Sequence, residues 1–108
     1  MNDWEAVFER ADSDNGPVLV VHGEIDLSVA ARFADALEGL VDGLEPRPVV
    51  DLAGVGFIDS AGVRELLKAQ RKTHEKGTDL VLRAPSDACR RVLRLSGVWG
   101  EFTVTDAA

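Results

Sequence analysis

Ser60 is the residue of this chain whose type and position are best suited to chemistry. It follows Asp59 at the point where a glycine-punctuated segment reaches the predicted start of a helix. A serine hydroxyl at a helix N-terminus lies where free backbone N–H groups and the positive end of the helix dipole converge. A phosphate attached to Ser60 would be stabilised there, and Gly62 in the first turn would leave room for another protein to approach.

Each of these residues also has a purely structural interpretation. Serine is among the commonest helix-capping residues, so Ser60 could serve only to cap the helix. Gly62 could be a compromise in packing, and Asp59 could be an ordinary turn residue before a helix. The local pattern alone leaves both interpretations open.

Nothing in the sequence supports an enzyme that uses Ser60 as its nucleophile. The residues around Ser60 do not match the G-x-S-x-G pattern, and no motif places His22 or His74 as a general base. No glycine loop of the Walker type is present. Cys89, the single cysteine, falls on an apolar helical stripe and is expected in the core. We therefore expect no enzymatic activity, no metal and no cofactor.

The whole chain, residues 1–108, is predicted to form one domain. Its formal net charge of −7 disfavours binding to nucleic acid and to anionic lipid headgroups. No apolar run approaches the roughly 20 residues needed to cross a bilayer, and the first residues lack the features of a signal peptide. We therefore expect a cytoplasmic protein with no membrane insertion and no direct contact with nucleic acid.

The order of elements that positions Ser60 is predicted as β-β-α-β-α-β-α-β. The predicted strands are Trp4–Phe8, Val18–His22, Val49–Leu52, Leu80–Leu82 and Phe102–Val104. The helices are predicted to begin at Ser28, Ser60 and the segment Pro85–Asp87, and to end near Gly43, Gly77 and Gly97. Buried strands that alternate with helices indicate an α/β fold with a mainly parallel sheet, to which the two opening strands add an antiparallel edge.

Turn-forming residues are predicted to separate these elements. Asp12–Pro17 is dense in turn formers and should reverse the chain between the first two strands. Pro46–Pro48 should prevent the first helix from continuing. Gly54 and Gly56 bracket Val55 in a predicted turn that leads from the third strand toward Asp59.

Three segments of the sequence resemble the motifs of one protein family. Asp59–Val63 resembles a D-S-S-G-L motif, and Gly23–Asp26 matches a G-E-[IL]-D motif that precedes it. Leu93–Phe102 resembles an L-x-x-x-G-L-x-x-x-F motif that follows it. These motifs are those of the bacterial STAS-domain anti-sigma-factor antagonists, and their order and spacing agree over nearly the whole chain. The resemblance implies the STAS fold.

The resemblance also implies a function. In that family the unphosphorylated antagonist binds an anti-sigma factor, often one that is also a serine kinase, and the sigma factor is thereby released. Phosphorylation of the serine that matches Ser60 blocks this association, and a phosphatase restores it. The residues predicted to face the partner or the kinase are Asp26, Asp59, Ala61, Gly62 and Arg64.

Asp26, like Asp59, could be only a turn residue before a helix, and Arg64 and Ala61 also have alternatives. Arg64 begins a series of cations on its helix, and these are most simply a solvated face, although they could contact an acidic partner. Ala61 stands where many family members have a second small hydroxyl residue. The resulting D-S-A-G form is compatible with a different role, because stand-alone STAS proteins also occur as cytoplasmic subunits of lipid-transport ABC systems. Neighbouring genes for an anti-sigma kinase or for a permease with its ATPase would distinguish the two roles.

Overall fold

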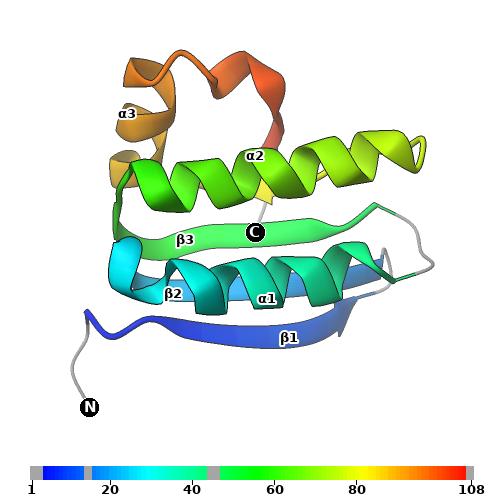
Figure 1. Ribbon diagram of the computed structural model, residues 1–108, viewed down its shortest axis with the longest axis horizontal. Helices are drawn as coiled ribbons and strands as arrows, with labels where there is room; N and C mark the ends of the chain where they lie inside the picture. The colour runs from blue at the N-terminus through cyan, green and yellow to red at the C-terminus, as the bar shows by residue number, and fades with distance from the viewer. Residues whose placement is uncertain (1–3, 14–15, 44–46, 107–108) are drawn as a thin grey trace.

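The computed structural model describes residues 4–13, 16–43 and 47–106, which form five strands and three α-helices (Figure 1). The strands are β1 (Val7–Ser13), β2 (Gly16–Ile25), β3 (Val49–Ile58), β4 (Val81–Arg83) and β5 (Thr103–Thr105). The helices are α1 (Ala30–Val41), α2 (Ser60–Glu75) and α3 (Asp87–Leu95), with the short 3-10 helices η1 (Leu27–Val29) and η2 (Trp99–Glu101). This order confirms the predicted β-β-α-β-α-β-α-β.

The strands form one sheet in the order β1-β2-β3-β4-β5. β1 pairs antiparallel with β2, and the other neighbours pair parallel, so the predicted mixed and mainly parallel α/β sheet is confirmed. α1 and α2 lie side by side over the sheet, and α3 lies at the end of the molecule where α2 begins (Figure 1). Because β2 and β3 are parallel neighbours, the residues that follow these two strands meet at one edge of the sheet.

The helices bury the apolar stripes that their spacing predicts. Phe33 and Leu37 of α1 and Leu66 of α2 are almost wholly buried in the core. Gln70, on the same side of α2, is buried as well. Gly77 adopts a φ of 82° just after α2, as expected for a glycine that ends a helix. None of the helices in the described residues is long and apolar enough to span a bilayer.

Cys89 of α3 is fully buried, which confirms its predicted place in the core. Ser86 caps the helix: its Oγ accepts a hydrogen bond from the Cys89 N–H at 3.2 Å and donates one to the Val55 carbonyl at 2.6 Å. Burial raises the pKa of the Cys89 thiol above its ordinary value. The thiol therefore stays in its neutral, less reactive form.

The first strand differs from its prediction. β1 begins at Val7 rather than Trp4 and continues to Ser13, through the start of the predicted Asp12–Pro17 loop. Its partners in β2 run from His22 opposite Val7 to Gly16 opposite Ser13. Cross-strand pairing therefore outweighs the turn-forming composition of this segment. Residues 14 and 15 of the predicted loop and Pro46 of the predicted helix stop lie outside the described residues.

The third strand is also longer than predicted. β3 does not turn at Gly54 and Gly56 but continues to Ile58, with two shifts of register against β2. Such shifts are β-bulges, which bend a strand and re-aim the side chains beyond them. A Cβ at Gly54 would lie 2.2 Å from Nδ1 of His22 on β2, so a larger residue here would require the exposed His22 side chain to move. The glycines therefore permit an irregular strand instead of ending it.

Candidate functional site

Each of two neighbouring strands ends in an isoleucine that is followed by an aspartate. Ile25 of β2 and Ile58 of β3 stand opposite each other in the sheet and are both buried. Asp26 and Asp59 follow them, and the Asp59 N–H donates to the Ile25 carbonyl at 3.1 Å. The parallel register thus brings together the two acidic residues that the sequence places 33 positions apart.

Asp59, not Ser60, caps helix α2. Its Oδ1 accepts hydrogen bonds from the N–H groups of Ala61 at 2.9 Å and Gly62 at 3.3 Å. Ser60 is the first residue of the helix, so the prediction that it is the capping residue is wrong. Aspartate and serine are almost equally good caps, and here the extended backbone at Asp59 places the carboxylate over the free N–H groups. The Ser60 hydroxyl is left without a hydrogen-bond partner among the described residues.

Asp26 has the same role at the start of η1. Its Oδ1 accepts from the backbone N–H of Ser28 at 2.9 Å and from the Ser28 hydroxyl at 2.5 Å. The bond from the Ser28 hydroxyl is the main cause that lowers the pKa of the Asp26 carboxyl. The prediction that Ser28 caps the first helix is therefore wrong as well. Ser28 lies inside η1, and its hydroxyl bonds to Asp26, which is the cap of η1.

Ala61 and Gly62, two of the residues predicted to face the partner, lie in the first turn of α2. Both are buried, and a Cβ on Gly62 would lie 2.7 Å from Cγ1 of Ile58 and 2.9 Å from Cγ2 of Ile25. Gly62 therefore lets the first turn of α2 approach the two isoleucines that precede the acidic residues. This burial agrees with the packing interpretation of Gly62, and the partner-facing role of the two residues stays a prediction.

The exposed side chains at this edge come from three short segments. Ser60 is exposed, and Arg64 lies one turn further along the same face of α2 and is also exposed. Leu27 in η1 exposes 74% of its surface, and Phe57 at the end of β3 exposes 45%. Sequence reasoning missed Leu27 and Phe57. A signal was available, since each lies within two residues of a capping aspartate, where the chain leaves the sheet.

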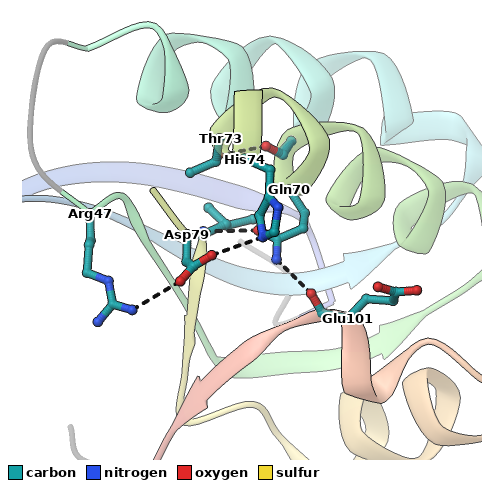
Figure 2. A network of polar contacts seen from close by, with 8 residues as sticks. Arg47, Gln70, Thr73, His74, Asp79 and Glu101 are labelled. Atoms are coloured by element: carbon teal, nitrogen blue, oxygen red, sulfur yellow. Dashed lines mark hydrogen bonds and ion pairs between the residues drawn. The ribbon is translucent and has the colours of Figure 1, made fainter. Parts of the chain in front are cut away.

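A second cluster of polar side chains lies near the other end of α2 (Figure 2). The Asp79 carboxylate accepts a hydrogen bond from a guanidinium nitrogen of Arg47 at 3.3 Å, and its other oxygen lies 3.0 Å from Nε2 of His74. The Gln70 amide donates to the Glu101 carbonyl at 2.6 Å and accepts from the Leu80 N–H at 3.0 Å. A hollow of about 540 Å³ is bordered by Gln70, His74, Asp79 and Glu101. Within the described ranges no group of three or more histidine, cysteine or acidic residues is arranged to hold a metal ion.

The fold and the site together define an α/β domain that presents an exposed serine, Ser60, at the C-terminal edge of its parallel strands. The model of one protein family, described as Mlab, STAS domain, matches residues 8–104. This span includes nearly the whole chain, and the chain therefore belongs to the STAS-domain family.

Solved structures share this fold. An anti-sigma factor antagonist from Mycobacterium paratuberculosis is 29% identical, with a TM-score of 0.86 over 95% of this chain and 87% of that one. SpoIIAA of Bacillus in its phosphorylated form is 20% identical, with a TM-score of 0.69 over 93% of this chain and 92% of that one. The anti-sigma factor antagonist SpoIIAA in its unphosphorylated form is 21% identical, with a TM-score of 0.68 over 93% and 89%. These likenesses confirm the predicted STAS fold.

Proposed function

We propose that this chain is an anti-sigma-factor antagonist that binds its partner through the surface around Ser60. In this proposal the unphosphorylated form binds an anti-sigma factor and releases the sigma factor, and phosphorylation of Ser60 blocks binding. The observation that carries it is the exposed Ser60, whose hydroxyl has no hydrogen-bond partner among the described residues, at an edge that also exposes Leu27 and Phe57. The likeness to an anti-sigma factor antagonist at 29% identity supports the same assignment.

The exposed apolar side chains account for affinity in this proposal. Large apolar residues at the centre of an interface commonly supply most of its binding energy, within a surrounding polar rim. Leu27 and Phe57 are suited to that central position, and Asp26, Asp59 and Arg64 are suited to the rim. The carboxylates of Asp26 and Asp59 already accept bonds from their own segments, so a partner would meet them in a fixed orientation.

The effect of a phosphate follows from the same geometry. It would bring a charge of about −1.5 to −2 next to two carboxylates, and Asp59 already occupies the N–H groups of Ala61 and Gly62. In the free protein, water and the Arg64 side chain one turn away can screen that charge. At a partner interface the charge would be desolvated without a matching cation, at a cost of several kcal/mol. The fold itself should tolerate the phosphate, and the similar TM-scores to phosphorylated and unphosphorylated SpoIIAA support that expectation.

The test is a titration of Ser60 variants against the anti-sigma factor that co-purifies with the unphosphorylated chain in its native host. Ser60→Ala should bind like the wild type and resist the kinase. Ser60→Glu should bind at least about tenfold more weakly, which corresponds to about 1.4 kcal/mol, with an unchanged melting temperature. Thr105→Glu places the same charge on an exposed residue of β5 and should bind normally. Equal affinities for the alanine, glutamate and wild-type forms would overturn the proposal.

The kinase and the phosphatase are proposed to be separate proteins, with the kinase activity residing in the anti-sigma factor. We also propose that the chain has no catalytic activity of its own, because no described residue is hydrogen-bonded to the Ser60 hydroxyl to act as its base. The purified protein should therefore turn over neither ATP nor model esters. A steady turnover that disappears in Ser60→Ala would contradict this.

A second candidate function keeps the same domain. The matched family model carries the name of a STAS protein, Mlab, rather than a description as an anti-sigma-factor antagonist. That observation favours testing the alternative, a STAS subunit of a lipid-transport ABC system, alongside the first. Co-purification decides between them: recovery of an ATPase and permease instead of an anti-sigma factor would favour the transport role.

A further inference from the structure

The outer face of α3 carries an unusual concentration of positive charge for so acidic a chain. Arg90, Arg91 and Arg94 lie within five consecutive residues, whereas the whole chain has a formal net charge of −7. Arg91 and Arg94 are exposed and form no ion pair with any described residue. Leu95 beside them exposes 82% of its surface. Arg91, Arg94 and Leu95 are neighbours on one face of a helix, since they are spaced by three and four residues.

Neighbouring groups hold two of these arginines, Arg90 and Arg94, in place. The Arg94 guanidinium lies 4.7 Å from the centre of the Trp99 ring, and that of Arg90 lies 5.6 Å from the same centre. Arg90 also donates to the Pro85 carbonyl at 3.0 Å and pairs with Asp106. A guanidinium stacked on an aromatic ring keeps its N–H edges free for a carboxylate, at a reduced cost in conformational entropy. The cluster is therefore partly pre-organised for an anionic group.

We propose that this face, defined by Arg91, Arg94, Leu95 and Trp99, docks a short acidic segment of a partner protein that also carries an apolar side chain. A hollow of about 480 Å³ lies over it and is lined by Asp87, Arg90, Arg91, Arg94 and Leu95. Carboxylates of the partner pair with Arg91 and Arg94, and its apolar side chain covers Leu95. Asp87, at the other end of the hollow, repels further carboxylates and so sets the direction of the segment.

The charges favour this occupant over other polyanions. A nucleic acid or an anionic membrane would approach the whole chain, and its net charge of −7 opposes a large negatively charged surface. A short segment contacts only the few arginines within a Debye length of about 8 Å. The proposal goes beyond the function assigned to Ser60 and does not depend on it. α3 and the first turn of α2 lie at the same end of the molecule, so one partner could reach both surfaces (Figure 1).

Trp99 provides a reporter for the test, because the chain has two tryptophans and Trp4→Phe leaves only Trp99. The probe is a ten-residue peptide of glutamate and aspartate with two leucines, titrated while Trp99 emission and backbone amide shifts are recorded. We expect saturable changes centred on residues 91–99 and at least about fivefold weaker binding between about 0.05 M and 0.5 M salt. Arg91→Glu with Arg94→Glu should weaken binding at least about tenfold.

Two matched variants make the outcome specific. Arg71→Glu with Lys72→Glu makes the same change of charge on exposed residues of α2 and should leave peptide binding within about twofold of the parent. Arg91→Glu alone removes no contact of the fold and guards against loss of structure in the double variant. Equal losses in both double variants, or shifts elsewhere on the protein, would overturn the proposal. A second outcome would also overturn it. In that outcome, Arg91→Glu with Arg94→Glu abolishes self-association or binding to phosphatidylserine vesicles but leaves peptide binding intact.

Discussion

At the N-terminal end of α2 the acidic side chains bond within their own segments, whereas at the C-terminal end polar side chains bond to other parts of the fold. Asp59 holds the first turn of its own helix, and Asp26 holds η1. By contrast, Gln70 joins α2 to Leu80 and Glu101, and Lys76 donates to the Val41 carbonyl at 2.6 Å. The Asp79 carboxylate forms an ion pair with Arg47 and contacts His74 of α2 (Figure 2).

This difference separates two tasks along one helix. The C-terminal end is fixed by bonds between distant segments, which only the folded chain can form. At the N-terminal end the side-chain bonds are short-range, and the backbone bond from Asp59 to Ile25 and the close packing of Gly62 complete the attachment. This end leaves apolar surface and Ser60 exposed. The C-terminal end therefore stabilises the domain, and the N-terminal end is the surface proposed above to bind a partner.

The largest effect on stability is expected at Gln70. Gln70→Ala would leave the Leu80 N–H and the Glu101 carbonyl without their partners and would open a cavity at a buried position. We expect a loss of about 2–4 kcal/mol in the free energy of unfolding. Urea unfolding measures it, with exposed Arg71→Ala as the control. Partner affinity of the folded fraction should not change, and a loss of affinity at unchanged stability would contradict the division between the two ends.

Gly62→Ala should affect both properties. Its Cβ would lie within 3 Å of side-chain atoms of Ile25 and Ile58, so the first turn of α2 must move outward. We expect a loss of about 1–3 kcal/mol in stability together with weaker partner binding, because Ser60 moves with the turn. Gly56→Ala is the matched control, since its Cβ would meet nothing within 4 Å. Stability and affinity that both remain at the wild-type level in Gly62→Ala would refute the close-packing argument.

The Asp59 variants separate capping from charge. Asp59→Ala removes the acceptor for two N–H groups and should cost about 1 kcal/mol of stability. Asp59→Asn retains an acceptor and should stay within a few tenths of a kcal/mol of the wild type. Asp59→Asn therefore removes the charge but keeps the cap. If the Asp59 carboxylate also contacts the kinase, this variant should be phosphorylated at Ser60 more slowly than the wild type. Thermal melts and the initial rate of phosphorylation measure the two effects, and equal melting temperatures for the alanine and asparagine variants would argue against the cap.

Sequence patterns predicted the arrangement of the site better than its details. The order of strands and helices follows from apolar periodicity, and it brings Asp26, Asp59 and Ser60 to one edge of a parallel sheet. The pattern could not decide whether Asp59 or Ser60 caps α2, because both residue types cap well and the two positions differ by one residue. Backbone conformation at Asp59 decides it, and that depends on the register of β3 against β2.

The position of Phe57 beside Asp59 was a signal of exposure, but the structural cause of that exposure was not visible in the sequence. Two bulges in β3 shift its pairing with β2, so Ile58 faces the core and Phe57 is exposed. Gln70 shows the opposite case, since its place on a buried helical stripe was visible in the sequence. Its partners were not, because the Leu80 and Glu101 backbone groups reach it only through tertiary structure. Contacts between distant segments are the part of this molecule that local patterns do not contain.

The smallest predicted effect concerns the pKa of Asp26. The bond from the Ser28 hydroxyl holds that pKa below its ordinary value of 3.8, so Ser28→Ala should raise it toward that value. A carboxyl whose pKa is lowered by folding stabilises the protein above its unfolded pKa, and this contribution is lost as the pH falls through the folded pKa. The wild type should therefore keep a small advantage over Ser28→Ala above about pH 4, and the two should converge in stronger acid. Titration of the Asp26 carboxyl carbon by NMR measures the shift directly, with Ser60→Ala as a control that should leave it unchanged. An Asp26 pKa that is the same in Ser28→Ala and the wild type would show that the backbone bonds alone hold this carboxylate, and that Ser28 has no part in positioning it beside Ser60.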